Sequence, residues 1–132
     1  MGVQLASVAV VVADYDAAIA FYCGVLGFEL VEDVAMPAGK RWVRIARAGG
    51  DPGASIVLAR AATDHQRSRV GDQTGGRVFL FLHTDDFERE HARLVGRGVR
   101  FVEPPRDEPY GRVAVFEDLY GNRIDLIEPR AR

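Results

Sequence analysis

The sequence contains one structural unit twice, and this internal repeat limits the possible folds more than any other feature. An apolar run ends at Asp14 and leads into a helix-like stretch, and a matching run ends at Asp86, 72 positions later. The copies match again at residues 56–58 and 124–126, which are 68 positions apart. A fixed long period indicates one supersecondary unit used twice. Corresponding positions of the two copies can therefore be compared within a single chain.

Hydrophobic periodicity predicts the order strand, helix and three strands in each copy. In the first copy, strands are expected at residues 5–12, 28–35, 41–48 and 54–59, with a helix at residues 15–26. In the second copy, strands are expected at residues 77–84, 99–102, 112–116 and 123–128, with a helix from residue 86 to about residue 97. Asp14 and Asp86 stand where helix N-caps belong.

These elements predict an α+β fold made of two tandem βαβββ modules at residues 1–60 and 77–129. A polar connector at residues 61–76 joins the modules into a single domain that spans residues 1–132. A helix buries its apolar stripe against one face of a sheet. We therefore expect one curved sheet, with helices on its outer face and a cup-shaped cavity on the other.

Composition and charge exclude several classes of function. The net charge is −2 without a basic cluster, so there is no electrostatic footprint for nucleic acid. No apolar run reaches the roughly 18–20 residues that a membrane-spanning helix needs. The N-terminus also lacks the pattern of a signal peptide. Cys23 is the single cysteine, which rules out an internal disulfide and fits a reducing compartment. We expect a cytoplasmic protein that contacts neither nucleic acid nor a membrane.

Three sequence patterns together carry a family resemblance. They are Asp14-x3-Ala18-x2-Phe21-Tyr22-x3-Leu26-Gly27-Phe28, then Asp85-Asp86 with Gly98-Val99, then Gly121-Asn122-x-Ile124-x-Leu126. In this order the chain resembles the vicinal oxygen chelate superfamily, which includes glyoxalase I, extradiol dioxygenases, fosfomycin-resistance enzymes and bleomycin-binding proteins. The resemblance implies the fold predicted above and a homodimer, but fold alone does not imply an activity.

The metal-dependent members of this superfamily carry four ligands, two in each module at equivalent positions, and these are usually His or Glu. The resemblance places the four positions at Ser7, Val57, Phe79 and Asp125. Divalent transition metals prefer His, Cys and carboxylate donors, and only Asp125 is one of these. We therefore expect no metal and no other cofactor.

Strand alternation predicts which side chains line the cup, because successive residues point to opposite faces. Aromatic walls and arginines are expected there, which suits a small aromatic ligand or an anionic group. Tyr110 is expected in a loop over one end of the cup. The expected ligand-binding residues are Trp42, Arg44, Val57, Phe79, Phe81, Tyr110, Arg112, Phe116, Arg123 and Asp125.

Two functional hypotheses follow, from different classes. The first is a metal-free small-molecule-binding protein of the glyoxalase/bleomycin-resistance type, which binds an aromatic or anionic compound in the cup. The second is a glyoxalase- or dioxygenase-type enzyme with a degenerate metal site centred on Asp125. In that enzyme Asp125 and His83 are the candidate catalytic residues, because a cup-facing carboxyl or imidazole can transfer protons. A domain retained mainly for association between subunits is a third alternative.

Overall fold

Each copy of the repeat forms its own four-stranded mixed sheet in the computed structural model, which describes residues 2–49 and 53–130. The chain divides into two units, Met1–Val70 and Gly71–Arg132, called here the N-terminal and C-terminal units. The α+β class and the strand–helix–three-strand order in each copy are confirmed. Strands pair within each unit, so a single sheet through both modules stays a prediction.

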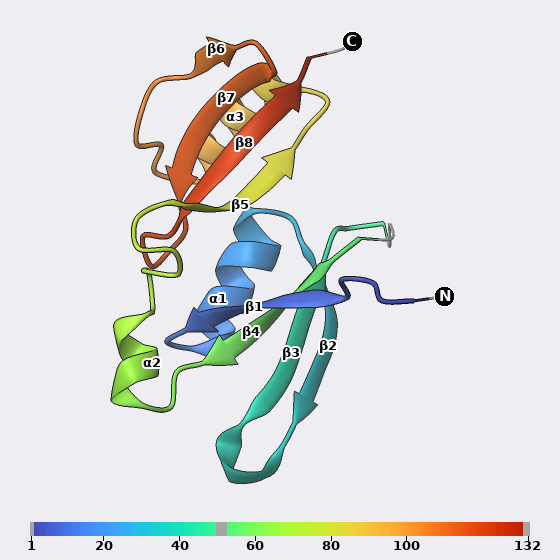
Figure 1. Ribbon diagram of the computed structural model, residues 1–132, viewed down its shortest axis with the longest axis vertical. Helices are drawn as coiled ribbons and strands as arrows, with labels where there is room; N and C mark the ends of the chain where they lie inside the picture. The colour runs from blue at the N-terminus through green and yellow to red at the C-terminus, as the bar shows by residue number, and fades with distance from the viewer. Residues whose placement is uncertain (1, 50–52, 131–132) are drawn as a thin grey trace. The chain divides into compact units, whose positions relative to one another are not determined.

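The N-terminal unit has its sheet in the order β1-β4-β3-β2, with β1 parallel to β4 and the other pairs antiparallel (Figure 1). The strands are β1 (Ser7–Val12), β2 (Glu29–Ala35), β3 (Arg41–Ala46) and β4 (Ser55–Arg60). The 3-10 turn η2 (Pro37–Gly39) connects β2 to β3, and the helix α2 (Asp64–Ser68) lies in the polar connector.

The N-terminal helix begins as predicted and changes its form half-way. Asp14 caps α1 (Tyr15–Ile19) by accepting a hydrogen bond from the Ala17 amide at 2.7 Å. The helix continues as the π-helix η1 (Ala20–Val25), in which the hydrogen bonds span five residues. Buried Tyr15, Ala18 and Tyr22 face the sheet core.

The C-terminal unit repeats this topology with the order β5-β8-β7-β6. The strands are β5 (Val78–His83), β6 (Arg106–Glu108), β7 (Gly111–Glu117) and β8 (Arg123–Pro129). Helix α3 (Phe87–Gly96) contacts β8 and lies behind β7 in Figure 1. Asp86 caps α3 by accepting a hydrogen bond from the Arg89 amide at 3.1 Å, as predicted.

One predicted strand is wrong. Residues 99–102 form no strand and contribute only an isolated bridge between Phe101 and Phe116. Val99 follows α3 and is buried, so its apolar side chain contributes to the core of the unit. The second strand of the unit is instead β6, where the sequence pattern predicts no strand, and it pairs with β7.

None of the described helices has the length and apolar character that crossing a membrane requires.

Candidate functional site

In each unit, one sheet face packs against the long helix and the other face does not. The second is called the open face, although its side chains on β7 and on most of β8 in the C-terminal unit are themselves buried. In the N-terminal unit, Val43 and Ile45 point to α1 and are fully buried. Trp42 and Arg44 alternate with them and therefore lie on the open face. Arg44 stands opposite Val57 of β4 in the strand register, which brings the predicted residues Trp42, Arg44 and Val57 onto one surface.

Glu32 of β2 hydrogen-bonds with both Trp42 and Arg44 on this surface. It stands opposite Arg44, and its Oε1 accepts hydrogen bonds from Arg44 Nε at 2.6 Å and from Trp42 Nε1 at 3.1 Å. The hydrogen bond from Arg44, followed by that from Trp42, lowers the pKa of Glu32. The carboxylate is therefore charged at neutral pH, and it fixes an indole ring that is 40% exposed.

A buried carboxyl group lies on the open face of the C-terminal unit. Asp125 of β8 is only 7% exposed and stands between Phe81 of β5 and Val115 of β7. Its Oδ1 has no hydrogen-bond partner among the described residues. Burial raises the pKa of Asp125, while the charge of Arg106 opposes this shift and Glu103 adds to it. An acid held in this way exchanges a proton closer to neutral pH than an exposed aspartate does.

Arg106 is the arginine that acts on Asp125, and its charge is already compensated. Its Nε donates to Glu108 Oε2 at 2.8 Å, and its Nη1 pairs with Glu103. The exposed Tyr110 lies in the turn between β6 and β7, and its side chain adds to the raised pKa of Arg106. The arginine therefore stabilises an ionised Asp125 only in part.

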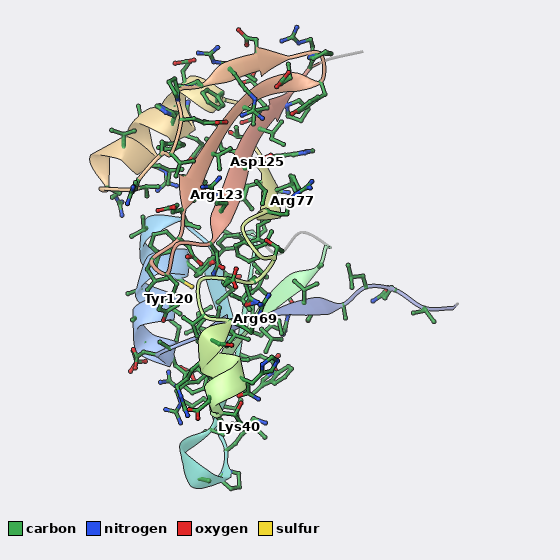
Figure 2. All side chains as sticks on the ribbon, turned by 60° about the vertical axis from the view of Figure 1, so that its left-hand side comes forward. Lys40, Arg69, Arg77, Tyr120, Arg123 and Asp125 are labelled. Carbon is green, nitrogen blue, oxygen red and sulfur yellow. The ribbon has the colours of Figure 1, made fainter. Side chains whose placement is uncertain are left out.

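Four other predicted residues lie on or near β5 and β8. Phe81 is 62% exposed and stands beside Asp125 in the register, and His83 follows two positions later on the same face. A register shift between Val78 and Leu80 leaves Phe79 as the extra residue of a bulge. Arg123 begins β8 and is exposed; Figure 2 shows it on the same strand as Asp125. Among the described residues it makes no ion pair with Asp125.

Two predicted ligand-binding residues lie on the wrong face, which corrects the prediction for Arg112 and Phe116. Phe116 is fully buried and contacts Phe101 on the α3 side, with ring centroids 5.5 Å apart. The Arg112 guanidinium lies over the ring of Phe87 in α3 and pairs with Glu88 at 3.1 Å. Because Val115 stands opposite Asp125, the alternate residues of β7 must point to the helix. We therefore leave both out of the candidate site.

The four positions that carry metal ligands in the metal-dependent relatives do not fit a metal ion. The Ser7 hydroxyl hydrogen-bonds with that of Ser55 at 2.7 Å, and Val57 and Phe79 have no donor atom. No cluster of three His, Cys, Asp or Glu side chains able to hold a metal exists in the part of the chain that the structure describes. Asp125 alone does not make such a site.

Sequence reasoning missed Glu32 and Arg106. The signal for Glu32 was present: counting back from the β2–β3 turn pairs Ala35 with Arg41 and Glu32 with Arg44. Arg106 had no such signal, because its strand is short and carries no apolar alternation.

The two tandem mixed sheets, each with a helix on one face and polar groups on the other, define a glyoxalase-type fold. The chain belongs to the Glyoxalase/Bleomycin resistance protein/Dioxygenase superfamily, whose family model matches residues 4–126. A relative from Shewanella frigidimarina is 49% identical over 126 residues, covering 95% of this chain and 93% of the relative.

Solved structures support the same assignment. The crystal structure of UcmS2 is similar with a TM-score of 0.83 and 29% identity, covering 97% of this chain and 99% of that one. TnmS3, an antibiotic-binding protein from Streptomyces sp. CB03234, is similar with a TM-score of 0.77 and 33% identity, covering 98% and 99% of the two chains.

Proposed function

We propose that the protein is a metal-free small-molecule-binding protein that binds an aromatic or anionic compound on its open sheet faces. The observation that carries this proposal is the exposed Trp42 ring, held in place by Glu32 beside Arg44. A fixed aromatic ring next to a few polar groups is typical of a small-molecule site. The similarity to TnmS3, which is described as an antibiotic-binding protein, supports the same class of function.

The chemistry of the positions equivalent to metal ligands supports the metal-free part of the proposal. Val57 and Phe79 offer no donor atom, and the Ser7 hydroxyl is a poor neutral donor that is bonded to Ser55. The measurement is metal content by mass spectrometry before and after incubation with Ni²⁺, Zn²⁺, Mn²⁺ and Fe²⁺. We expect no stoichiometric metal; a stoichiometric ion that Asp125→Ala abolishes would reject this part.

The ligand-binding part is tested by a thermal-shift screen of small aromatic compounds and aromatic carboxylates. A ligand that binds only the folded protein raises the melting temperature with its concentration. We expect a saturable ligand with defined stoichiometry and no turnover. A screen without any compound that raises the melting temperature would contradict the proposal.

Two truncation variants test whether the ligand binds on the open faces. Trp42→Ala and Phe81→Ala each remove one exposed ring, and either loss should weaken a stacked ligand about five- to tenfold. Val95→Ala is the matched control, because Val95 is also exposed but lies on α3. Equal affinities for all four proteins would place the ligand elsewhere.

A second candidate function is an enzyme of the glyoxalase or dioxygenase type with an altered site centred on Asp125. The buried carboxyl with an unpartnered Oδ1 favours this alternative, because it can take up and release a proton. In such an enzyme Asp125→Ala removes turnover while the circular dichroism spectrum stays unchanged. Turnover that persists in this variant would reject the alternative, including any role of Asp125 with His83.

We also propose that the protein is a homodimer. Strands β1 and β5 each stand at the end of their sheet, and an edge strand offers unpaired backbone groups to a partner. Phe81 and Val34 expose apolar surface on the open faces, which favours association. Light scattering after size exclusion should give twice the mass of 14.5 kDa. A monomer at micromolar concentration would reject the dimer.

A cytoplasmic location completes the proposal, and the single cysteine, which forms no disulfide, supports it. Cell fractionation of the native host tests this location directly.

A further inference from the structure

Glu32 connects Trp42 and Arg44 on the N-terminal open face through a single oxygen atom. Oε1 accepts from Trp42 Nε1 at 3.1 Å and from Arg44 Nε at 2.6 Å. A ring and a guanidinium that share one acceptor cannot rotate independently without losing a hydrogen bond. The surface is therefore set before a ligand arrives, which lowers the entropic cost of binding.

The same contact offsets the positive charge of Arg44, which would otherwise attract an anion. Arg44 attracts a negatively charged ligand, and Glu32 repels it from nearly the same place. A second carboxylate, Glu29, stands opposite Ala46 on this face. Arg41 and Asp33 bond to each other, and Arg41 contacts Asp16 of α1, so that pair belongs to the opposite face. The charged side chains of β2 and β3 thus give this open face more negative than positive charge.

We propose that Glu32 is a specificity-determining residue: it positions Trp42 for stacking and cancels the charge of Arg44, so that this face selects uncharged or cationic aromatic compounds over aromatic anions. The inference rests on the proposed function and narrows its ligand class. Glu32 favours binding of an aromatic compound without negative charge and opposes binding of an anionic one.

The test uses three probes of the same shape and different charge: 2-naphthamide, 2-naphthoate and 2-naphthylmethylammonium. Binding to the full-length protein is followed by ¹H–¹⁵N correlation spectra. Because Trp42 is the single tryptophan, its indole N–H gives one resolved signal that reports on both the hydrogen bond to Glu32 and the bound ring. The same titrations are made on Glu32→Gln and Glu32→Ala.

We expect the wild-type protein to bind the amide and the ammonium more tightly than the carboxylate. Glu32→Gln keeps an acceptor for the indole but removes the charge, so the relative affinity for 2-naphthoate should rise about fivefold, the size of one screened charge contact. Glu32→Ala should in addition shift the indole signal of the unliganded protein and weaken all three probes. These three results together support the proposal.

Asp33→Asn is the matched control. It makes the same charge change at the next position of the same strand, but Asp33 bonds to Arg41 on the opposite face. In this control the relative affinities for the three probes should stay as in the wild-type protein. If the probes bind to Glu32→Gln with the same relative affinities as to the wild-type protein, the proposed role of Glu32 is overturned, while the proposed function is not. No binding of any probe to a folded protein overturns the proposed function and this inference with it.

Discussion

Replacing Asp125 with asparagine should stabilise the protein at neutral pH. The side chain is 7% exposed, and its Oδ1 has no hydrogen-bond partner among the described residues. Burying a polar atom without a partner costs about 1–3 kcal/mol and more when the group is charged, so the ionised carboxylate costs more than the neutral amide of asparagine. Arg106 offsets part of this cost, so we expect Asp125→Asn to raise the free energy of unfolding by about 1 kcal/mol at pH 7, at the low end of that range.

The gain in the free energy of unfolding should increase from acidic to neutral pH. Burial raises the pKa of Asp125 in the folded protein above its value in the unfolded chain. Between these two pKa values the folded state binds more protons, so the wild-type protein loses stability as the pH rises through this window. The variant lacks this loss. The difference between the two proteins should therefore be close to zero near pH 3.5 and largest at pH 7.

Urea unfolding followed by circular dichroism at pH values from 3.5 to 7 measures this difference. The control is Asp85→Asn, which removes an exposed carboxylate just before α3 and should not reproduce the pH-dependent gain. The reasoning is refuted if Asp125→Asn is no more stable than the wild-type protein at pH 7. A gain that is the same at every pH would also refute it, because it could not come from the ionised carboxyl.

Two further predictions concern residues that maintain the fold around the candidate site. Gly71 has a φ of 78°, and a Cβ atom there would lie 2.1 Å from the Tyr120 carbonyl oxygen. Gly71→Ala should therefore destabilise the protein by at least about 2 kcal/mol in urea unfolding, whereas Gly75→Ala, with a φ of 67° but open space, should cost only the backbone strain. Phe116→Leu should lower the free energy of unfolding by about 1 kcal/mol and leave the affinity for 2-naphthamide unchanged, since Phe116 faces α3. A clear loss of probe affinity in Phe116→Leu would restore this residue to the site.

Local signals in the sequence were enough to predict most of the fold. Aspartate before a helical pattern predicted both N-caps, and β-branched runs predicted the parallel strands. Strand β6 could not be predicted in this way, because its residues 106–108 are all charged. It forms only because β7 offers a free edge for pairing, and that pairing is tertiary information.

The candidate site was harder to predict because it depends on which way each strand faces. On β7, Val113 and Val115 are as apolar as Ala114 and Phe116, so alternation alone does not show which pair meets the helix. Only the register with Asp125 decides this, and it decides against Phe116. A strand buried on both faces gives no usable alternation.

The internal repeat separates the residues that maintain the fold from those that define the site. Ile56 and Ile124 are equivalent, identical and buried toward the helix of their own unit, because any βαβββ module must bury this face. Their neighbours on the open face differ: Val57 stands beside Arg44, whereas the equivalent Asp125 stands between Phe81 and Val115. Packing against the helix constrains the first pair in the same way in both copies, whereas the second pair has different surroundings in the two units. The residue at this position therefore depends on the open face of its own unit, and the helix side that the two units share does not determine it.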